Sequence, residues 1–167
     1  MVADKGCEIM ENKQTLAKKL SITDILSEVP QEYSDFVLQA HELLTKNGYK
    51  SKFQLKRHGL SAQYNSPKTK GNVLQLIVKN NVLQMYLYNI FFYEFNGFLE
   101  NLPLVVIKQY DEYRNCTDSC DPVCEEGRRN YYAINGKQYR KCSCGRQFFT
   151  VDEEIAAGIL SVLQKLA

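Results

Sequence analysis

The chain of 167 residues is long enough for one domain, and its net charge of +2 excludes a polycation of the histone type. Hydrophobic residues make up 44% of the sequence, and eight Phe and eleven Tyr add large side chains, so a single core can be filled. We expect one domain over residues 1–167.

Residues 13–48 are predicted to form a pair of helices, because apolar residues recur there at helix-like intervals. Pro30 opens the second helix. The apolar side chains on one face of this helix are Phe36, Val37, Ala40, Leu43 and Leu44. Asn47-Gly48 ends it, since glycine is common just past a helix.

Residues 49–88 are predicted to form an antiparallel sheet of about four strands. Phe53 and Leu55 alternate with Lys52 and Lys56, which gives one apolar face and one wet face. Asn80-Asn81 is a tight turn between two of the strands. Together with the helices, this pattern predicts an α+β fold in which N-terminal and C-terminal helices pack on the sheet.

The last third of the chain combines helices with a hairpin. Pro103 is well placed in the first turn of a helix that reaches about residue 113. Asn135-Gly136 separates two β-prone runs and predicts a hairpin within a cysteine-rich insertion, residues 114–148. Thr150 and Glu153 have the spacing of a capping box, which opens the closing helix, residues 150–166.

Two features predict a cytoplasmic protein outside the membrane. The first residues lack an apolar run behind a positive stretch, so we expect no cleaved export signal. The most apolar run, residues 82–99, is interrupted by polar residues and is too polar for a span of about 20 residues. Thiols stay reduced in the cytoplasm.

Five of the six cysteines lie in one short segment: Cys116, Cys120, Cys124, Cys142 and Cys144. The predicted hairpin returns the second group of cysteines beside the first, as in zinc ribbons. We therefore predict a structural Zn²⁺ bound by Cys120, Cys124, Cys142 and Cys144, with Cys116 as a spare or alternative ligand. The result would be a zinc-stapled hairpin.

Other interpretations of the cysteines stay open. In one alternative the cysteines are ordinary thiols or form a regulated disulfide. In the other they hold an iron–sulfur cluster, although their spacing matches neither common ferredoxin pattern. The spacing does not decide which four of the five cysteines bind the metal, and it does not decide whether the metal is zinc or iron. Basic residues crowd the same segment, among them Arg140, Lys141 and Arg146. They compensate the charge of a zinc–thiolate centre or, alternatively, form a phosphate-binding surface.

The second notable feature is a sheet without carboxylates. Residues 43–93 contain eight Lys or Arg and no Asp or Glu. With a period of two, the wet face would carry Lys52, Gln54, Lys56, Gln63, Gln75, Gln84, Tyr86 and Tyr88. Cations, amides and tyrosines together bind phosphates and stack on bases.

We therefore predict an anionic ligand, either nucleic acid or a phosphorylated small molecule, bound by Lys52, Lys56, Arg57, Tyr86 and Tyr88. The alternative is a solvated face on which lysines discourage aggregation. His58 could contact a phosphate or act as a general base. Alternatively, it is an ordinary loop histidine. No catalytic triad, phosphate-binding loop or dinucleotide motif is found, so we expect no enzyme.

The stretch that begins Ile25-Leu-Ser-Glu-Val-Pro-Gln-Glu-Tyr and ends at Leu44 resembles the opening helices of the small YdhG-like domains. That family includes bacterial frataxin-like iron chaperones. The run VKNNVLQMYLY and the helix after Thr150 resemble its central hairpin and closing element. The resemblance implies helices on one side of an antiparallel sheet and a function in iron handling. The cysteine-rich insertion and the carboxylate-free sheet depart from the family pattern.

The sequence thus predicts a non-enzymatic, zinc-stapled cytoplasmic domain that binds an anionic ligand. An iron chaperone or metal-delivery protein is the first alternative. A protein–protein adaptor or inhibitor, with a protein partner in place of the anion, is the second.

Overall fold

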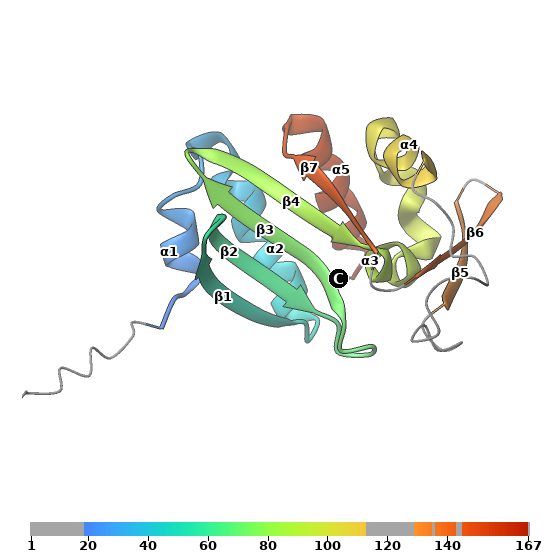
Figure 1. Ribbon diagram of the computed structural model, residues 1–167, viewed down its shortest axis with the longest axis horizontal. Coiled ribbons are helices and arrows are strands. Elements are labelled where there is room, and N and C mark those ends of the chain that lie inside the picture. The colour runs from blue at the N-terminus through green and yellow to red at the C-terminus, as the bar shows by residue number, and fades with distance from the viewer. Residues whose placement is uncertain (1–18, 113–128, 135, 143–144, 167) are drawn as a thin grey trace, which may run out of the picture.

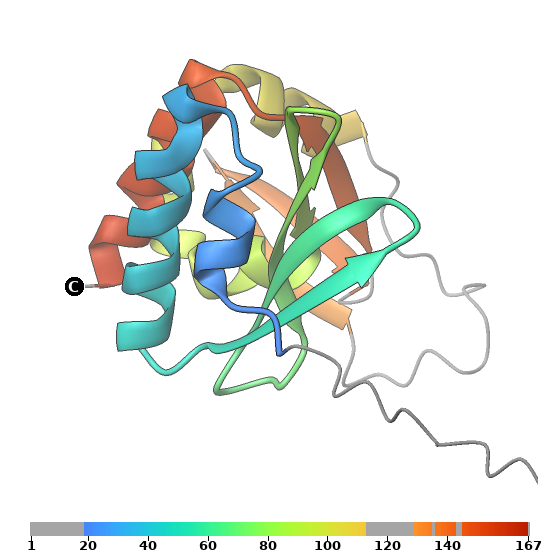
Figure 2. The same cartoon turned by 90° about the vertical axis from the view of Figure 1, so that its left-hand side faces the viewer.

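The computed structural model describes residues 19–112, 129–134, 136–142 and 145–166. Its main element is a five-stranded antiparallel sheet in the order β1-β2-β3-β4-β7. Helices α2 and α5 lie side by side on one face of this sheet, the inner face (Figures 1 and 2). In the described part of the chain no helix covers the opposite, outer face (Figure 2). The predicted α+β class is confirmed.

The N-terminal helices are α1 (Ile22–Leu26), the short 3₁₀ helix η1 (Gln31–Tyr33) and α2 (Ser34–Lys46). Helix α1 begins after Ser21, whose backbone N–H and hydroxyl both donate to the Asp24 carboxylate at 2.9 Å. Helix α2 ends as predicted, because Asn47 caps it and Gly48 adopts a positive φ of 83°.

Four strands follow: β1 (Lys50–Lys56), β2 (Gly59–Asn65), β3 (Asn72–Lys79) and β4 (Val82–Tyr88). Asn80 and Asn81 join β3 to β4 with φ values of 51° and 58°, a left-handed conformation that asparagine tolerates in tight hairpins. The four antiparallel strands predicted within residues 49–88 are therefore confirmed.

The sheet has a fifth strand that the sequence interpretation missed. Strand β7 (Arg146–Thr150) pairs antiparallel with β4. It is followed by α5 (Glu153–Leu163) and η4 (Gln164–Leu166). The predicted capping box is wrong: Thr150 belongs to β7, and Asp152 caps α5 by accepting a hydrogen bond from the Ile155 N–H at 2.8 Å.

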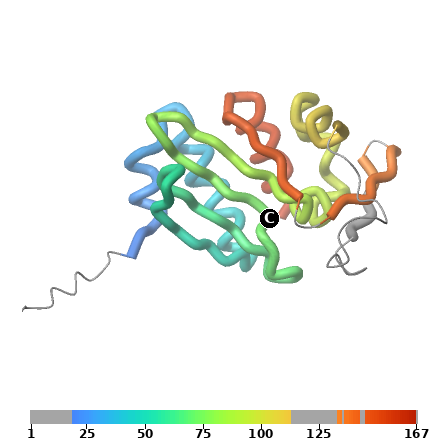
Figure 3. The backbone as a smooth tube through the Cα atoms, in the orientation of Figure 1, coloured from blue at the N-terminus to red at the C-terminus, as the bar shows by residue number. Residues whose placement is uncertain are grey.

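Between β4 and β7 the chain forms α3 (Asn89–Glu94), η2 (Asn96–Asn101), α4 (Leu104–Glu112) and a hairpin of β5 (Arg129–Ile134) and β6 (Lys137–Cys142). The helix after Pro103 and the hairpin at Asn135-Gly136 are as predicted. The hairpin lies at the end of the molecule opposite α1 (Figure 3). No helix among the described residues is both long and apolar enough to cross a membrane.

The core lies between the inner face of the sheet and the helices. Leu76 and Met85 on the sheet and Val37 and Ile159 on the helices are fully buried. The aromatic run after β4 also belongs to the core, as its Phe92 ring stacks on Tyr110 of α4 at 3.9 Å. Burial of these side chains fixes the sheet against α2 and α5 and leaves the outer face to polar residues.

His41 provides a test of this packing. Its Nδ1 lies 3.1 Å from the Tyr64 hydroxyl oxygen, and its ring contacts those of Phe53 and Tyr64. Burial lowers the pKa of His41 below 6.5, and the charge of Glu42 opposes this only in part. A lowered pKa means that the unfolded chain binds the His41 proton more tightly than the folded chain does. The free energy of unfolding should therefore be higher above pH 6.5 and should decrease as the pH falls below 6.5.

The chain has two histidines, so an NMR titration with a His41→Asn variant for assignment resolves the pKa of His41. We expect a midpoint below 6.5. A midpoint at or above 6.5 would contradict the packing described here.

Candidate anion-binding site

The strand register gathers one residue from each strand into a row across the outer face. Lys52 pairs with Gln63, Gln63 with Gln75, Gln75 with Tyr86, and Tyr86 with Phe148. Side chains of directly paired residues lie on the same face of a sheet. The amides and tyrosine that the sequence pattern assigned to the wet face therefore meet in one row, and β7 adds an aromatic ring.

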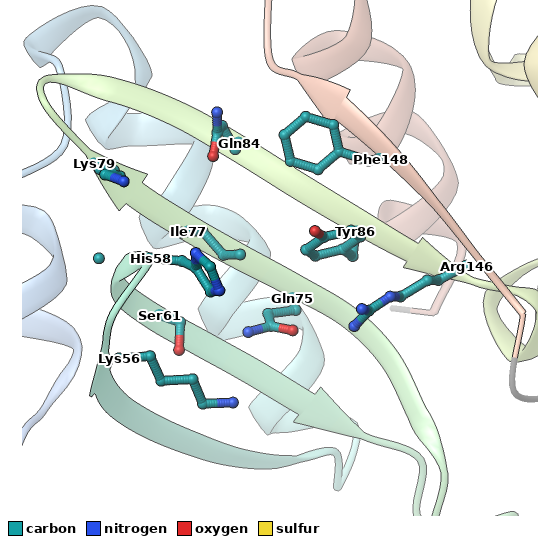
Figure 4. Close-up of a pocket in the computed structure, with 11 residues that line it drawn as sticks. Lys56, His58, Ser61, Gln75, Ile77, Lys79, Gln84, Tyr86, Arg146 and Phe148 are labelled. Carbon is teal, nitrogen blue, oxygen red and sulfur yellow. The ribbon is translucent and has the colours of Figure 1, made fainter.

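A cavity of about 390 Å³ opens on this face (Figure 4); we term it the sheet hollow. Its floor consists of Ser61, Gln75 and Ile77, whose exposed fractions are 2%, 6% and 6%. Its walls are Lys56, His58, Gly59, Lys79, Gln84, Tyr86, Arg146 and Phe148. Side chains at the rim thus surround a floor of two polar residues and one isoleucine, which no helix in the described part of the chain covers.

Gln75 presents an unused donor on this floor. Its Oε1 accepts a hydrogen bond from the Tyr88 hydroxyl at 3.2 Å. Its amide nitrogen has no hydrogen-bond partner among the described residues and points across the hollow toward Ser61 and Lys56 (Figure 4). This nitrogen is open to the cavity, so water or a ligand in the hollow can accept a hydrogen bond from it.

Two lysines and a histidine line one side of the sheet hollow. Lys56, His58 and Lys79 come from the hairpin end of β1 and β2 and from the end of β3 (Figure 4). Gly59 suits this hairpin for two reasons. Its φ is 115°, and a Cβ atom there would lie only 2.1 Å from the Val78 carbonyl oxygen on the neighbouring strand. None of the three forms an ion pair with a carboxylate among the described residues, and no Asp or Glu lines the cavity.

Aromatic rings and an arginine line the other side. The rings of Tyr86 and Phe148 are 5.1 Å apart, and Phe148 is 40% exposed. The Arg146 guanidinium lies 4.4 Å from the centre of the Tyr86 ring and donates to the Tyr88 hydroxyl at 3.5 Å. The fixed arginine, stacked on a ring, is preorganised to bind a planar or phosphate group.

The predicted ligand residues are placed differently. Lys56 and Tyr86 line the sheet hollow. Tyr88 does not line it, but its hydroxyl donates to Gln75 and accepts from Arg146, which both do. Lys52 instead lines a separate cavity with Leu20 and Phe53. Arg57 is exposed in the hairpin turn and is not among the lining residues.

The sequence interpretation missed Arg146 and Phe148 because β7 was not predicted, and it left His58 undecided. Residues 146–150 give little sequence signal for β7, because Gln147 is buried and Phe148 is exposed, the reverse of what their polarity predicts.

Asn89 connects the hollow to the cysteine-rich segment. Its fully buried side chain donates to the Cys142 carbonyl and accepts from the Gln147 amide at 3.2 Å. Its backbone N–H donates to the Gly145 carbonyl at 2.8 Å, and the Gly145 N–H donates to the Cys142 carbonyl at 3.0 Å. These bonds fix where β6 ends and where β7 begins with Arg146.

Of the predicted zinc ligands only Cys142 is described; Cys116, Cys120, Cys124 and Cys144 lie outside the described residues. Within the described ranges, no group of three or more His, Cys, Asp or Glu could hold a metal ion. Zinc binding by the cysteines therefore stays a prediction.

Comparison of the chain with protein-family models, curated proteins and solved structures finds no match. The similarity to YdhG-like domains remains a hypothesis. The geometry of the sheet hollow is therefore the basis for assigning a function.

Removal of the Asn89 side chain is expected to destabilise the protein. Asn89→Ala leaves the buried Gln147 amide without its acceptor, which costs about 1–3 kcal/mol. Asn96→Ala, at an exposed asparagine, is the control. Urea denaturation of both variants measures the difference, and equal stability of the two would contradict the role given to Asn89.

Proposed function

We propose that the protein is a non-enzymatic binding protein for a phosphate-bearing anion, which occupies the sheet hollow. The observation that carries this proposal is the side of the cavity with Lys56, His58 and Lys79 and without carboxylates. Clefts lined by charges of one sign concentrate the field and attract counter-ions. A phosphate group supplies the charge and the hydrogen-bond acceptors that these side chains lack within the described protein.

The floor supports the same interpretation. Gln75 is more than nine-tenths buried and offers a free amide N–H₂, and Arg146 approaches from the opposite side. Phosphate oxygens accept hydrogen bonds from amides and guanidinium groups alike. The alternative raised by the sequence, a solvated lysine face, does not by itself account for a hollow with lysines on one side and an arginine on the other.

Binding is favoured over catalysis because the lining lacks the parts of a nucleophilic site. The Ser61 hydroxyl donates to the Gln54 carbonyl at 3.3 Å, and no carboxylate lines the hollow to orient His58 as a base. The same lack of carboxylates makes the hollow a poor site for iron, a hard cation that prefers oxygen ligands. An iron chaperone would need a different site.

We also propose that a structural zinc ion staples the hairpin of β5 and β6. Arg129, which follows Cys124 by five residues in the sequence, pairs with Cys142 of the second cysteine group. This hairpin pairing is the geometry expected of a ribbon-type site. Since Arg146 follows the same segment, a metal there would also stabilise the start of β7.

Charge reversal tests the anion site. Lys56→Glu should weaken binding of pyrophosphate by about tenfold or more, because an attraction is replaced by a repulsion at the cavity wall. Lys68→Glu changes the net charge equally but lies in the exposed β2–β3 loop, and should have a small effect. Lys52→Glu measures whether the ligand extends beyond the hollow.

Isothermal titration calorimetry at two salt concentrations gives these affinities and their salt dependence. If Lys56→Glu and Lys68→Glu weaken binding equally, the interaction is one of net charge and the proposed site is wrong.

Metal content tests the staple. Protein purified without chelator should contain about one zinc ion per chain by elemental analysis. Cys142→Ser should lower this content and the thermal stability, since binding energy at such sites is largely folding energy. Cys7→Ser, outside the cysteine cluster, is the matched control. Full metal content in Cys142→Ser, or none in the parent protein, would overturn the zinc proposal.

A further inference from the structure

The two sides of the sheet hollow differ in chemistry. Lys56, His58 and Lys79 gather on one side, and Tyr86 and Phe148 with Arg146 on the other (Figure 4). A simple anion such as phosphate would use only the first side. The aromatic side therefore calls for a second, planar part of the same ligand.

The register gives the separation of the two sides. Gln75 pairs with Tyr86, and Lys79 lies four residues further along β3. At a rise of about 3.3 Å per residue, the aromatic row and the Lys79 end are roughly 13 Å apart along the strand. A ligand that reaches both must carry its ring and its phosphate at opposite ends.

We propose that the ligand is a free nucleotide, with its phosphates at Lys56, His58 and Lys79 and its base against Phe148 and the Arg146–Tyr86 pair; this rests on the proposed anion-binding function. The ring of Phe148 is 40% exposed, so its face is open for stacking. Arg146 covers Tyr86 and is itself exposed, so its outer face can stack on a base.

The amides supply contacts to the base and sugar. The Gln75 nitrogen points across the floor, and Gln84 lies on the same wall as Phe148, one row further toward Lys79 (Figure 4). Amide side chains donate to and accept from the edges of bases that are not paired. They can also bond ribose hydroxyls, which lie between base and phosphate.

A free nucleotide fits better than a strand of nucleic acid. In single-strand binding proteins cations follow the whole groove, because each nucleotide brings a phosphate. Here two lysines and a histidine gather on one side, and Lys52, four residues before Lys56 on β1, lies outside the cavity. A volume of about 390 Å³ is within the ~300–1,000 Å³ range of small-molecule sites.

The test compares ligands that share phosphates and differ in the base. Affinities of the full chain for a nucleoside 5′-monophosphate and for ribose 5-phosphate are measured by calorimetry, with pyrophosphate and a short single-stranded oligonucleotide as further probes. We expect the nucleotide to bind about tenfold more tightly than ribose 5-phosphate, since stacking contributes this order of affinity.

Phe148→Leu should reduce that ratio toward one, because leucine keeps an apolar side chain but has no ring. Phe98→Leu, at an aromatic ring that is similarly exposed on η2, should leave it unchanged. Thermal denaturation of both variants establishes that they are folded. Lys56→Glu should weaken the nucleotide and ribose 5-phosphate alike.

The outcomes separate the two levels of the proposal. Equal affinity for nucleotide and ribose 5-phosphate would overturn the nucleotide inference and leave the anion site in place. Binding of the oligonucleotide without binding of free nucleotides would also overturn it, in favour of nucleic acid. No binding of any phosphate-bearing probe would overturn the proposed function itself.

Discussion

The pairing of β7 with β4 is the constraint on which the proposed site depends. It joins a strand near the C-terminus to a sheet built by residues 50–88, and it places Phe148 opposite Tyr86 and Arg146 opposite Tyr88. Without this pairing the outer face would lack Arg146 and Phe148, and Tyr86 would lie on an edge strand. With it, the face has an aromatic wall, and Lys56 of β1 and Lys79 of β3 lie across the floor from that wall.

The position of β7 is itself determined by buried polar contacts. Asn89 ends β4 and begins α3, and its hydrogen bonds fix the Cys142 carbonyl, Gly145 and Gln147. A buried amide is stabilising only when its partners are in place, so this residue specifies one arrangement of the chain. The cysteine-rich segment and the sheet hollow are thereby linked through a few residues of backbone.

Local patterns predicted most of the fold. Asn80-Asn81 and Asn47-Gly48 act within a few residues, and the structure follows them. The alternation around Phe53 predicted a strand correctly, but its apolar face holds only in part, because Leu55 is 72% exposed. Strand β7 depends instead on pairing with β4 some sixty residues earlier, which no local pattern encodes. The same distinction applies to the residues of the site. Lys56 and Tyr86 could be assigned to the wet face from alternation within their own strands. Arg146 and Phe148 reach this face only because β7 pairs with β4.

The most direct measurement is a map of amide chemical shifts in ¹⁵N-labelled protein during a titration with pyrophosphate. Binding in the sheet hollow predicts the largest changes at His58, Gly59 and Lys79, with smaller changes at Gln75 and Gln84 across the floor and wall. Changes confined to the lysines of the β2–β3 loop, or spread evenly over all exposed lysines, would contradict the assignment of this cavity as the binding site.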